Sequence, residues 1–383
     1  MTEETCVMEP KHNSLRATSL MVSLVLVVAW PAASGATQDW ASFRGNIQMT
    51  GIATMSPPLT TAPRLLWTYE TGSSIESTAA IVNDTAYVGT MTNALLAIDL
   101  NTGRLRWKFV GAGPISASPT VAGGLVYIGD ESGMFYAVDR ATGRQRWSFK
   151  AQDKITSSAA VTSGAVIFGS YDNFLYALSA DKGTKLWAFQ ADAQVHCSPC
   201  VGGGAAIING CDGYVRFIDA KTGRERSRAS MESNFAAAPA YSAGNAFVCS
   251  MDGQYACIRA SDGKTLWQVA VTRNGGASWA SPVLGSENVI FASRNRTVFA
   301  LNRKSGATKW VFTAGDAVDS SPVISGSRLY FGCDDGVIYG LNASTGVKAW
   351  SFNAGARVSA SPAIGRGRMV IGTTDGAVYC FGR

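Results

Sequence analysis

The chain has 383 residues, and its 33 lysines and arginines against 27 aspartates and glutamates give a formal net charge of +6. Charged residues make up only 16%, below the roughly 25% of average soluble proteins, and glycine is abundant. This composition is typical of tightly packed, turn-rich β structure. The positive charges form no Lys/Arg block, so we expect no nucleic-acid partner.

The first 36 residues have the layout of a signal peptide. An apolar run of eleven residues, 20–30, follows Lys11 and Arg16 and precedes a segment of small residues that ends at Ala36. This pattern predicts a signal peptide over residues 1–36, with cleavage near Ala36. A retained membrane anchor is the alternative, although a membrane-spanning helix needs about 20 apolar residues. We expect a periplasmic or secreted protein with no stable membrane span after cleavage.

Residues 37–63 predict an N-terminal linker rather than a separate domain, because glycine and proline interrupt the segment. Three aromatic or charged side chains stand near its start. We expect these residues, Trp40, Phe43 and Arg44, to fix the linker to the side of the domain that follows.

From residue 64 onward the sequence repeats. A tryptophan column recurs every 40 residues, with one step of 43, and only Ser227 interrupts it. The structural anchors in this column are Trp67, Trp107, Trp147, Trp187, Trp267, Trp310 and Trp350. A fixed period of about 40 residues indicates an array of repeated units. Because Ser227 lacks the packing indole, we expect its repeat to be the softest, and Ser227→Trp to raise the melting temperature.

Each period holds four short runs that are typical of antiparallel strands. In the second repeat these are 115–121, 126–130, 135–139 and 146–149, rich in Val, Ile, Tyr and Phe. Asp-Gly and similar pairs between the second and third runs supply the positive φ that hairpins need. Four antiparallel strands are the unit of a β-propeller blade. The sequence therefore predicts an all-β, eight-bladed propeller over residues 64–383, with its ring closed by the N-terminal Trp67 strand.

The repeat signature, with Tyr136, Asp139, Gly143 and Trp147 in the second unit, resembles the pyrroloquinoline-quinone-like (PQQ-like) propeller repeat. The opening segment 39–46 is similar to that of secreted family members, and the resemblance covers residues 39–383. Its layout is closest to the propeller subunit of the outer-membrane β-barrel assembly machinery, a scaffold lipoprotein without cofactor. This chain departs from that lipoprotein, because no cysteine follows the apolar run to carry a lipid.

The same family contains quinoprotein dehydrogenases, so the resemblance leaves two functional classes open. Those enzymes hold a calcium-bound quinone over the axis of the ring and often stack it on a disulfide between adjacent cysteines. This sequence has no Cys-Cys pair, and its repeats lack the long insertions that build the cofactor pocket. We therefore expect no cofactor, with PQQ and calcium as the alternative.

Cysteine and histidine give no further sign of catalysis. Cys197 and Cys200 have a metal-like spacing beside His196, but on a strand residues three apart point to opposite faces, and no second pair has zinc-site spacing. Cys249, Cys257 and Cys380 fall in columns of glycine or alanine, as buried apolar groups do. His196 is the single histidine after residue 36, which leaves no basis for a Ser-His-Asp arrangement. We expect no catalytic residues and no metal ligands.

One column of the first strands changes its chemistry from repeat to repeat. In propellers these strands line the central channel, and the column holds Glu76, Ser116, Thr156, His196, Ala236, Trp279, Asp319 and Ser359. We expect Glu76, His196, Trp279 and Asp319 to form a ligand-binding site at the channel mouth. The alternative is a water-filled channel with inert polar walls. The step of 43 residues lengthens the loop at 271–279, beside Trp279, and such loops tend to carry binding functions.

The sequence therefore favours an exported, monomeric, non-enzymatic propeller scaffold that binds envelope or secreted proteins or peptides. The alternative is a PQQ- or metal-dependent oxidoreductase that acts at the channel mouth. A sensor or a carbohydrate-binding protein is a third class.

Overall fold

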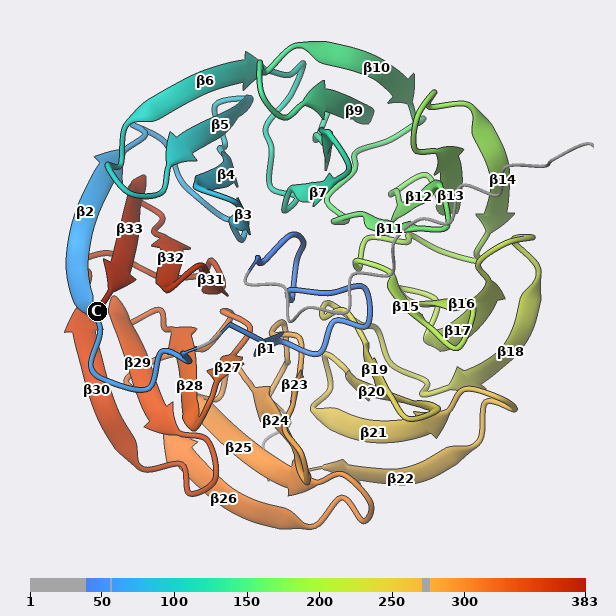
Figure 1. The fold of residues 1–383 in the computed structure, drawn as a ribbon. Helices are drawn as coiled ribbons and strands as arrows, with labels where there is room; N and C mark the ends of the chain where they lie inside the picture. Colours follow the sequence, from blue (N-terminus) through green and yellow to red (C-terminus); the bar gives the residue numbers. More distant parts are fainter. Residues whose placement is uncertain (1–38, 56, 271–275) are drawn as a thin grey trace, which may run out of the picture. The chain divides into compact units, whose positions relative to one another are not determined.

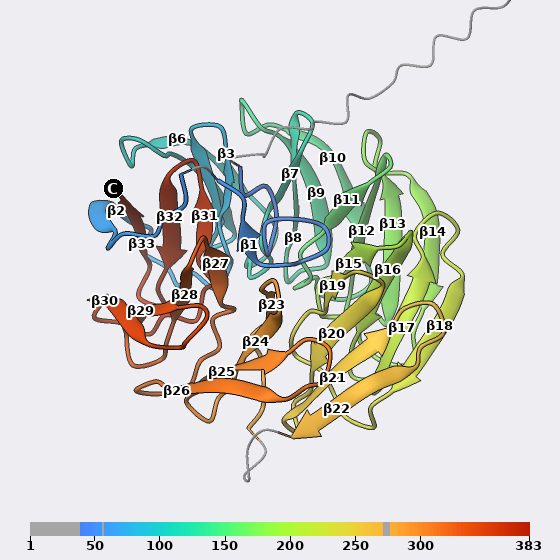
Figure 2. The ribbon, with the colours of Figure 1, turned by 60° about the horizontal axis from the view of Figure 1, so that its bottom comes forward.

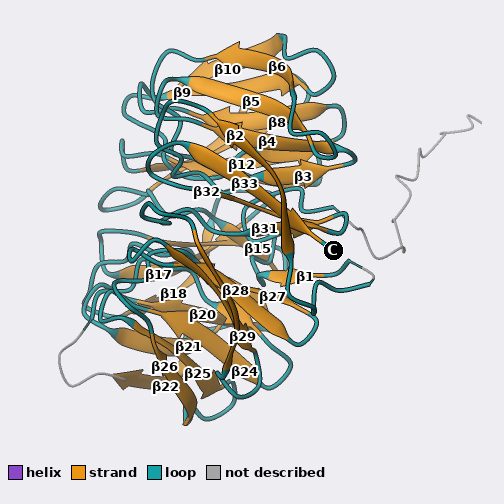
Figure 3. Ribbon diagram, turned by 90° about the vertical axis from the view of Figure 1, so that its left-hand side faces the viewer, coloured by secondary structure: helices purple, strands orange, loops and turns teal. Residues whose placement is uncertain are grey.

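The computed structural model describes residues 39–383, apart from 56 and 271–275. The predicted signal peptide and most of the lengthened loop lie outside the described residues. All regular secondary structure in the described part of the chain is β strand (Figure 3). Within these residues, no helix is long and apolar enough to cross a membrane.

The strands form eight antiparallel blades around a central axis, which confirms the prediction from the repeat (Figure 1). The first blade contains β3 (Ala80–Val82), β4 (Thr85–Gly89), β5 (Ala94–Asp99) and β6 (Leu105–Val110). The second contains β7 (Thr120–Ala122), β8 (Leu125–Gly129), β9 (Met134–Asp139) and β10 (Gln145–Lys150). The third contains β11 (Ala160–Thr162), β12 (Ala165–Gly169), β13 (Phe174–Ser179) and β14 (Lys185–Gln190). The fourth contains β15 (Cys200–Gly202), β16 (Ala205–Asn209), β17 (Tyr214–Asp219) and β18 (Glu225–Ser230).

The other four blades follow the same order from the axis outward. The fifth contains β19 (Ala240–Ser242), β20 (Asn245–Cys249), β21 (Gln254–Arg259) and β22 (Thr265–Ala270). The sixth contains β23 (Val283–Leu284), β24 (Asn288–Ala292), β25 (Thr297–Asn302) and β26 (Thr308–Thr313). The seventh contains β27 (Val323–Ser325), β28 (Arg328–Gly332), β29 (Val337–Asn342) and β30 (Lys348–Asn353). The eighth contains β31 (Ala363–Gly365), β32 (Arg368–Gly372), β33 (Ala377–Gly382) and the N-terminal strand β2 (Arg64–Glu70).

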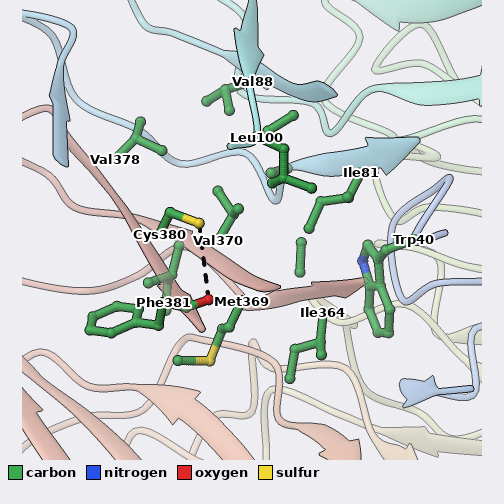
Figure 4. Close-up of a cluster of buried hydrophobic side chains, with 14 of the residues drawn as sticks. Trp40, Ile81, Val88, Leu100, Ile364, Met369, Val370, Val378, Cys380 and Phe381 are labelled. Carbon is green, nitrogen blue, oxygen red and sulfur yellow. Dashed lines mark hydrogen bonds between the residues drawn. The ribbon is translucent and has the colours of Figure 1, made fainter. Parts of the chain in front are cut away.

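The ring is closed by β2, as predicted. This strand pairs antiparallel with β33, and Trp67 lies opposite Cys380 in the register. Side chains of the first and eighth blades form one buried cluster behind the closure, which includes Ile81, Val370 and Phe381 together with Trp40 from the N-terminal segment (Figure 4). The last blade therefore has a complete sheet and shares a core with the first.

The innermost strands are shorter than the sequence suggests. The predicted run 115–121 forms a ladder only over β7, Thr120–Ala122. Pro119 has no N–H group to donate to a ladder. Just before it, the backbone N–H of Ser118 donates to the hydroxyl of Ser158 in the next blade at 3.0 Å. In this first part of the run, the chain thus makes hydrogen bonds to the neighbouring blade instead of forming a ladder.

The tryptophan column joins each blade to the next. The indole N–H of Trp67 donates to the carbonyl of Leu100 at 2.9 Å, and that of Trp107 donates to Arg140 at 3.0 Å. The ring of Trp67 covers Gly103, where a Cβ would lie 2.9 Å from the indole and where φ is 71°. Glycine is therefore required at this turn for both its backbone conformation and the close approach.

The space beside Ser227 is filled by backbone and is not left open, which corrects the packing argument for a soft edge. The Ser227 hydroxyl donates to the carbonyl of Ala260 at 3.0 Å. This bond is the counterpart of the one made by the indoles of Trp67, Trp107, Trp147, Trp187 and Trp267. A Cβ at Gly263 would lie 2.3 Å from the carbonyl oxygen of Arg228, whereas the equivalent glycines face an indole. The backbone of the fourth blade has moved into the space that a tryptophan would fill.

The first part of the N-terminal linker runs inside the ring, which corrects the expectation that Trp40, Phe43 and Arg44 lie on the side of the domain (Figures 1 and 2). We call residues 40–53 the axial segment. Its carbonyls accept backbone N–H groups of the innermost strands in five pairs: Ala41 with Val121, Ile47 with Val201, Gln48 with Tyr241, Thr50 with Leu284 and Gly51 with Ile324, at 2.6–2.9 Å. Trp40 bridges Ile81 in the same way, and β1 (Ile52–Ala53) pairs parallel with β27.

This route has a simple physical cause. The innermost strand of each blade has a free edge toward the axis, and its N–H groups can donate to a backbone carbonyl of any residue type. Trp40 and Arg44 are only 1% and 0% exposed as a result. The axial segment crosses the channel beside the turns between the first and second strands, so it obstructs that end.

Candidate functional site

The other end of the channel keeps a cavity of about 220 Å³, which we call the cup. Phe43 of the axial segment contributes to its lining. The wall has two levels, because residues two apart on an extended chain point the same way. The upper level is Glu76, Ser116, Thr156, His196, Ala236, Trp279, Asp319 and Ser359. The lower level is Thr78, Ser118, Ser158, Ser198, Ala238, Ser281, Ser321 and Ser361.

All four residues predicted to form the site, Glu76, His196, Trp279 and Asp319, line the cup. The structure thus brings together side chains from the first, fourth, sixth and seventh repeats. Their role in ligand binding stays a prediction, and their surroundings differ in ways that the sequence did not indicate.

Asp319 is held by two arginines. Arg294 donates to both carboxylate oxygens at 2.8 and 2.7 Å, and Arg357 donates to one of them at 2.8 Å. Arg357 also pairs with Asp334 at 2.8 Å. The side chain of Asp319 is only 8% exposed. Its carboxylate is therefore already compensated and acts to position the two guanidinium groups at the rim.

Trp279 is the exposed aromatic residue of the upper level, with 42% of its surface accessible. The guanidinium carbon of Arg294 lies 3.6 Å from the centroid of its ring. A cation at this distance is attracted by the ring quadrupole. The Asp319 pair and this stack together fix Arg294 against the indole, whose remaining accessible surface lies at the mouth.

The opposite side of the mouth is acidic. Glu76 is exposed, and Glu131 accepts a hydrogen bond from the Ser116 hydroxyl at 2.8 Å. Partial burial raises the pKa of the Glu76 carboxyl, the nearby Glu131 carboxylate raises it further, and Arg357 opposes both. The rim thus carries two arginines on one side and two carboxylates on the other.

His196 lies beside a thiol and an aromatic ring. Its Nδ1 is 3.8 Å from Sγ of Cys211, and the Tyr171 ring lies 5.6 Å away between centroids. Burial lowers the pKa of the imidazole below its ordinary value, and the positive charge of Lys154 adds to this. His196 is therefore neutral at pH 7 and offers one donor and one acceptor.

The serines of the lower level were not recognised as a functional set from the sequence. Their hydroxyls accept backbone N–H groups of the preceding blade at 2.9–3.0 Å, in the pairs Thr78–Ser118, Ser118–Ser158, Ser158–Ser198, Ala238–Ser281, Ser281–Ser321 and Ser321–Ser361. Ala238 has no hydroxyl and interrupts the series. The sequence signal for this set is a hydroxyl residue that recurs at the repeat period.

The residues present do not fit a calcium-bound quinone. Among the described residues, no group of three or more His, Cys, Asp or Glu side chains could hold a metal ion. All seven described cysteines are unpaired, and Asp319 is bound to two arginines. The cup is also smaller than the roughly 300–1,000 Å³ of typical cofactor and drug-sized sites.

Comparison with protein-family models identifies a family for this chain. The family model described as outer membrane protein assembly factor BamB matches residues 59–158, 131–224 and 211–381. These matches cover the propeller almost completely. A comparison with curated proteins gives no significant match.

Solved structures with the same fold include both functional classes. BamB from Moraxella catarrhalis is 19% identical, with a TM-score of 0.73 over 84% of this chain and 98% of that chain. Quinohemoprotein alcohol dehydrogenase from Comamonas testosteroni is 15% identical, with a TM-score of 0.78 over 92% and 81%. A europium-containing methanol dehydrogenase is 12% identical, with a TM-score of 0.78 over 90% and 98%. At these identities the likeness establishes the fold and leaves the function to the site.

Proposed function

This chain belongs to the family of the outer membrane protein assembly factor BamB, and on that premise we propose that it is an exported, non-enzymatic scaffold. It binds other envelope proteins, or peptides from them, through the mouth of the cup. The observation that carries this proposal is the composition of the rim, where an exposed tryptophan and two fixed arginines face two carboxylates.

The rim has the residue types that dominate protein recognition. Tryptophan and arginine are enriched among the residues that contribute most to binding free energy. Trp279 and Arg294 are held by stacking and by the ion pair with Asp319, so little side-chain freedom is lost when a partner docks. Opposite charges across the rim would orient a polar partner.

The size of the cup supports a protein partner in a second way. A cavity of about 220 Å³ accepts one or two side chains, while the rest of the partner contacts the surrounding turns. The oxidoreductase alternative has no observation of its own in its favour, because the dehydrogenases resemble this chain in fold alone.

Photocrosslinking tests the proposal. A photoreactive phenylalanine analogue replaces Met251, whose turn occupies the same place in the fifth blade as that of Arg294 in the sixth. The matched control carries the analogue at Arg144, an exposed turn residue on the opposite face. We expect discrete crosslinks to envelope proteins from position 251 only.

The same experiment with Trp279→Ala added should lose most of the crosslinks, because truncating an interface hot spot typically costs about 2 kcal/mol or more. Equal crosslinking from both faces, or full crosslinking without the indole, would refute the mouth as the docking site.

A further inference from the structure

We propose that the lower level of the cup is a binding site for a carboxylate group. The serine hydroxyls of the lower level act as hydrogen-bond acceptors toward the protein backbone. Each of the six hydroxyl oxygens already accepts a backbone N–H, so its own proton must point elsewhere. Among the described residues, none of these six hydroxyls donates to a protein acceptor.

The six hydroxyl groups converge on one place. They belong to Ser118, Ser158, Ser198, Ser281, Ser321 and Ser361, which line the same cavity, and all are between 2% and 8% exposed. Buried polar groups in proteins are normally hydrogen-bonded, and a buried donor without a partner is costly. A hydrogen-bond acceptor placed between these O–H donors would therefore stabilise the ring of hydroxyls.

The electrostatics beside the cup favour an anion. Arg44, next to Phe43 in the axial segment, is 0% exposed, and its Nη2 donates to the carbonyl of Pro282 at 3.0 Å. Pro282 directly follows Ser281 of the serine ring. Nε and Nη1 of Arg44 have no hydrogen-bond partner among the described residues. Arg44 does not line the cup itself, but its buried positive charge, bonded to the residue that follows Ser281, disfavours a metal cation in the cup and stabilises a negative group there.

The site suits a single negative charge. A carboxylate has about four lone-pair positions and can accept from several of the hydroxyls at once. A phosphate dianion would demand more positive charge than one guanidinium, and the Glu76 and Glu131 carboxylates at the mouth oppose a larger negative charge. A carboxylate also occupies only part of the available 220 Å³.

A peptide can supply such a group from its C-terminus or from an acidic side chain. This extension rests on the proposed function, since it makes the carboxylate the part of a docked partner that enters the cup. The carboxylate site itself can be tested without any partner, so the two proposals can fail separately.

The first test uses sodium acetate on the purified chain, with sodium chloride at equal ionic strength as the reference. We expect acetate to raise the melting temperature in a saturable manner, because it binds only the folded state. Three short alanine peptides then separate the sources: one with a free C-terminus, one amidated, and one amidated with an aspartate. Tighter binding of the free acid would assign the C-terminus, and tighter binding of the aspartyl peptide would assign a side chain.

Variants of adjacent serines separate binding from folding. Ser321→Ala removes one ring donor, and we expect it to weaken acetate binding about three- to tenfold. Ser320→Ala is the matched control, because that hydroxyl accepts the N–H of Gly332 within its own blade at 2.9 Å. Ala238→Ser should tighten binding, since it adds a hydroxyl at the interrupted position.

The inference is overturned if acetate and chloride shift the melting temperature equally. It is also overturned if Ser321→Ala and Ser320→Ala change the acetate affinity equally, because the effect would then be structural. Carboxylate binding without any partner crosslinks would leave the site standing and refute only the scaffold proposal.

Discussion

Replacing Arg44 by methionine should stabilise the protein. The guanidinium is buried inside the ring, where burial lowers its pKa to about 9. It makes one hydrogen bond, from Nη2 to the carbonyl of Pro282, and two of its nitrogens have no partner among the described residues. Methionine has a similar length and carries no charge, so Arg44→Met removes the charge and keeps much of the packing.

The magnitude follows from the pKa. Each tenfold change in proton affinity is worth about 1.4 kcal/mol, so the depression to about 9 represents roughly 4–5 kcal/mol of destabilisation at neutral pH. The substitution leaves the Pro282 carbonyl without its donor, which costs about 1–3 kcal/mol. The free energy of unfolding should therefore increase by about 1–4 kcal/mol, in line with other buried charges replaced by apolar residues.

Denaturant unfolding at several pH values provides the assay. The folded-state pKa of this base is lowered, so the unfolded state binds more protons between about pH 9 and the ordinary pKa of arginine. The advantage of Arg44→Met should be constant below about pH 9 and shrink above it, as the folded wild-type chain loses this proton. A variant that is less stable at pH 7 would refute the reasoning, because it would mean that the guanidinium is well compensated. If the carboxylate site exists, the stabilised variant should also bind acetate more weakly.

Three further predictions concern single side chains. Ser227→Trp should lower the melting temperature, because the Arg228 backbone occupies the space of an indole; a gain in thermal melting would show that this backbone moves back at little cost. Glu76→Gln should match the wild type near pH 4, in the range of the ordinary carboxyl pKa, and be more stable at pH 7. The raised folded-state pKa of Glu76 means that the wild type loses stability as the pH rises through it, and parallel denaturant curves at both pH values would contradict this. Cys211 should be the first of the seven described cysteines to react with iodoacetamide in the native state, because the other six are buried. The raised pKa of its thiol, caused by partial burial and by Asp212, should make the reaction slow at pH 7, and mass spectrometry showing another site first would contradict this assignment.

The fold could be predicted because the same residue pattern recurs in each repeat of the chain. The Trp column at Trp107, Trp147 and Trp187 recurs with one spacing, and each indole bonds the next blade in the same way. Closure by β2 followed from the count of strands. The route of the axial segment could not be predicted, because its contacts are mostly backbone carbonyls that carry no residue signature.

The positions of the site residues could be predicted from the sequence, but most of their interactions could not. The column of Glu76, His196, Trp279 and Asp319 follows from strand periodicity alone. That Asp319 is compensated by Arg294 and Arg357 depends on loops 25 and 38 residues away, whose approach only the folded ring determines. The directions of the serine hydroxyl bonds likewise require the distances between blades.

In the proposed function, the mouth of the cup recognises protein rather than a quinone. Titration of the purified chain with pyrroloquinoline quinone and calcium tests this most directly, with tryptophan fluorescence and the melting temperature as readouts. We predict no saturable change in either, since the described residues offer no calcium ligand set. Saturable quenching with a rise in melting temperature, lost in Trp279→Ala, would contradict the scaffold and place the chain among the oxidoreductases.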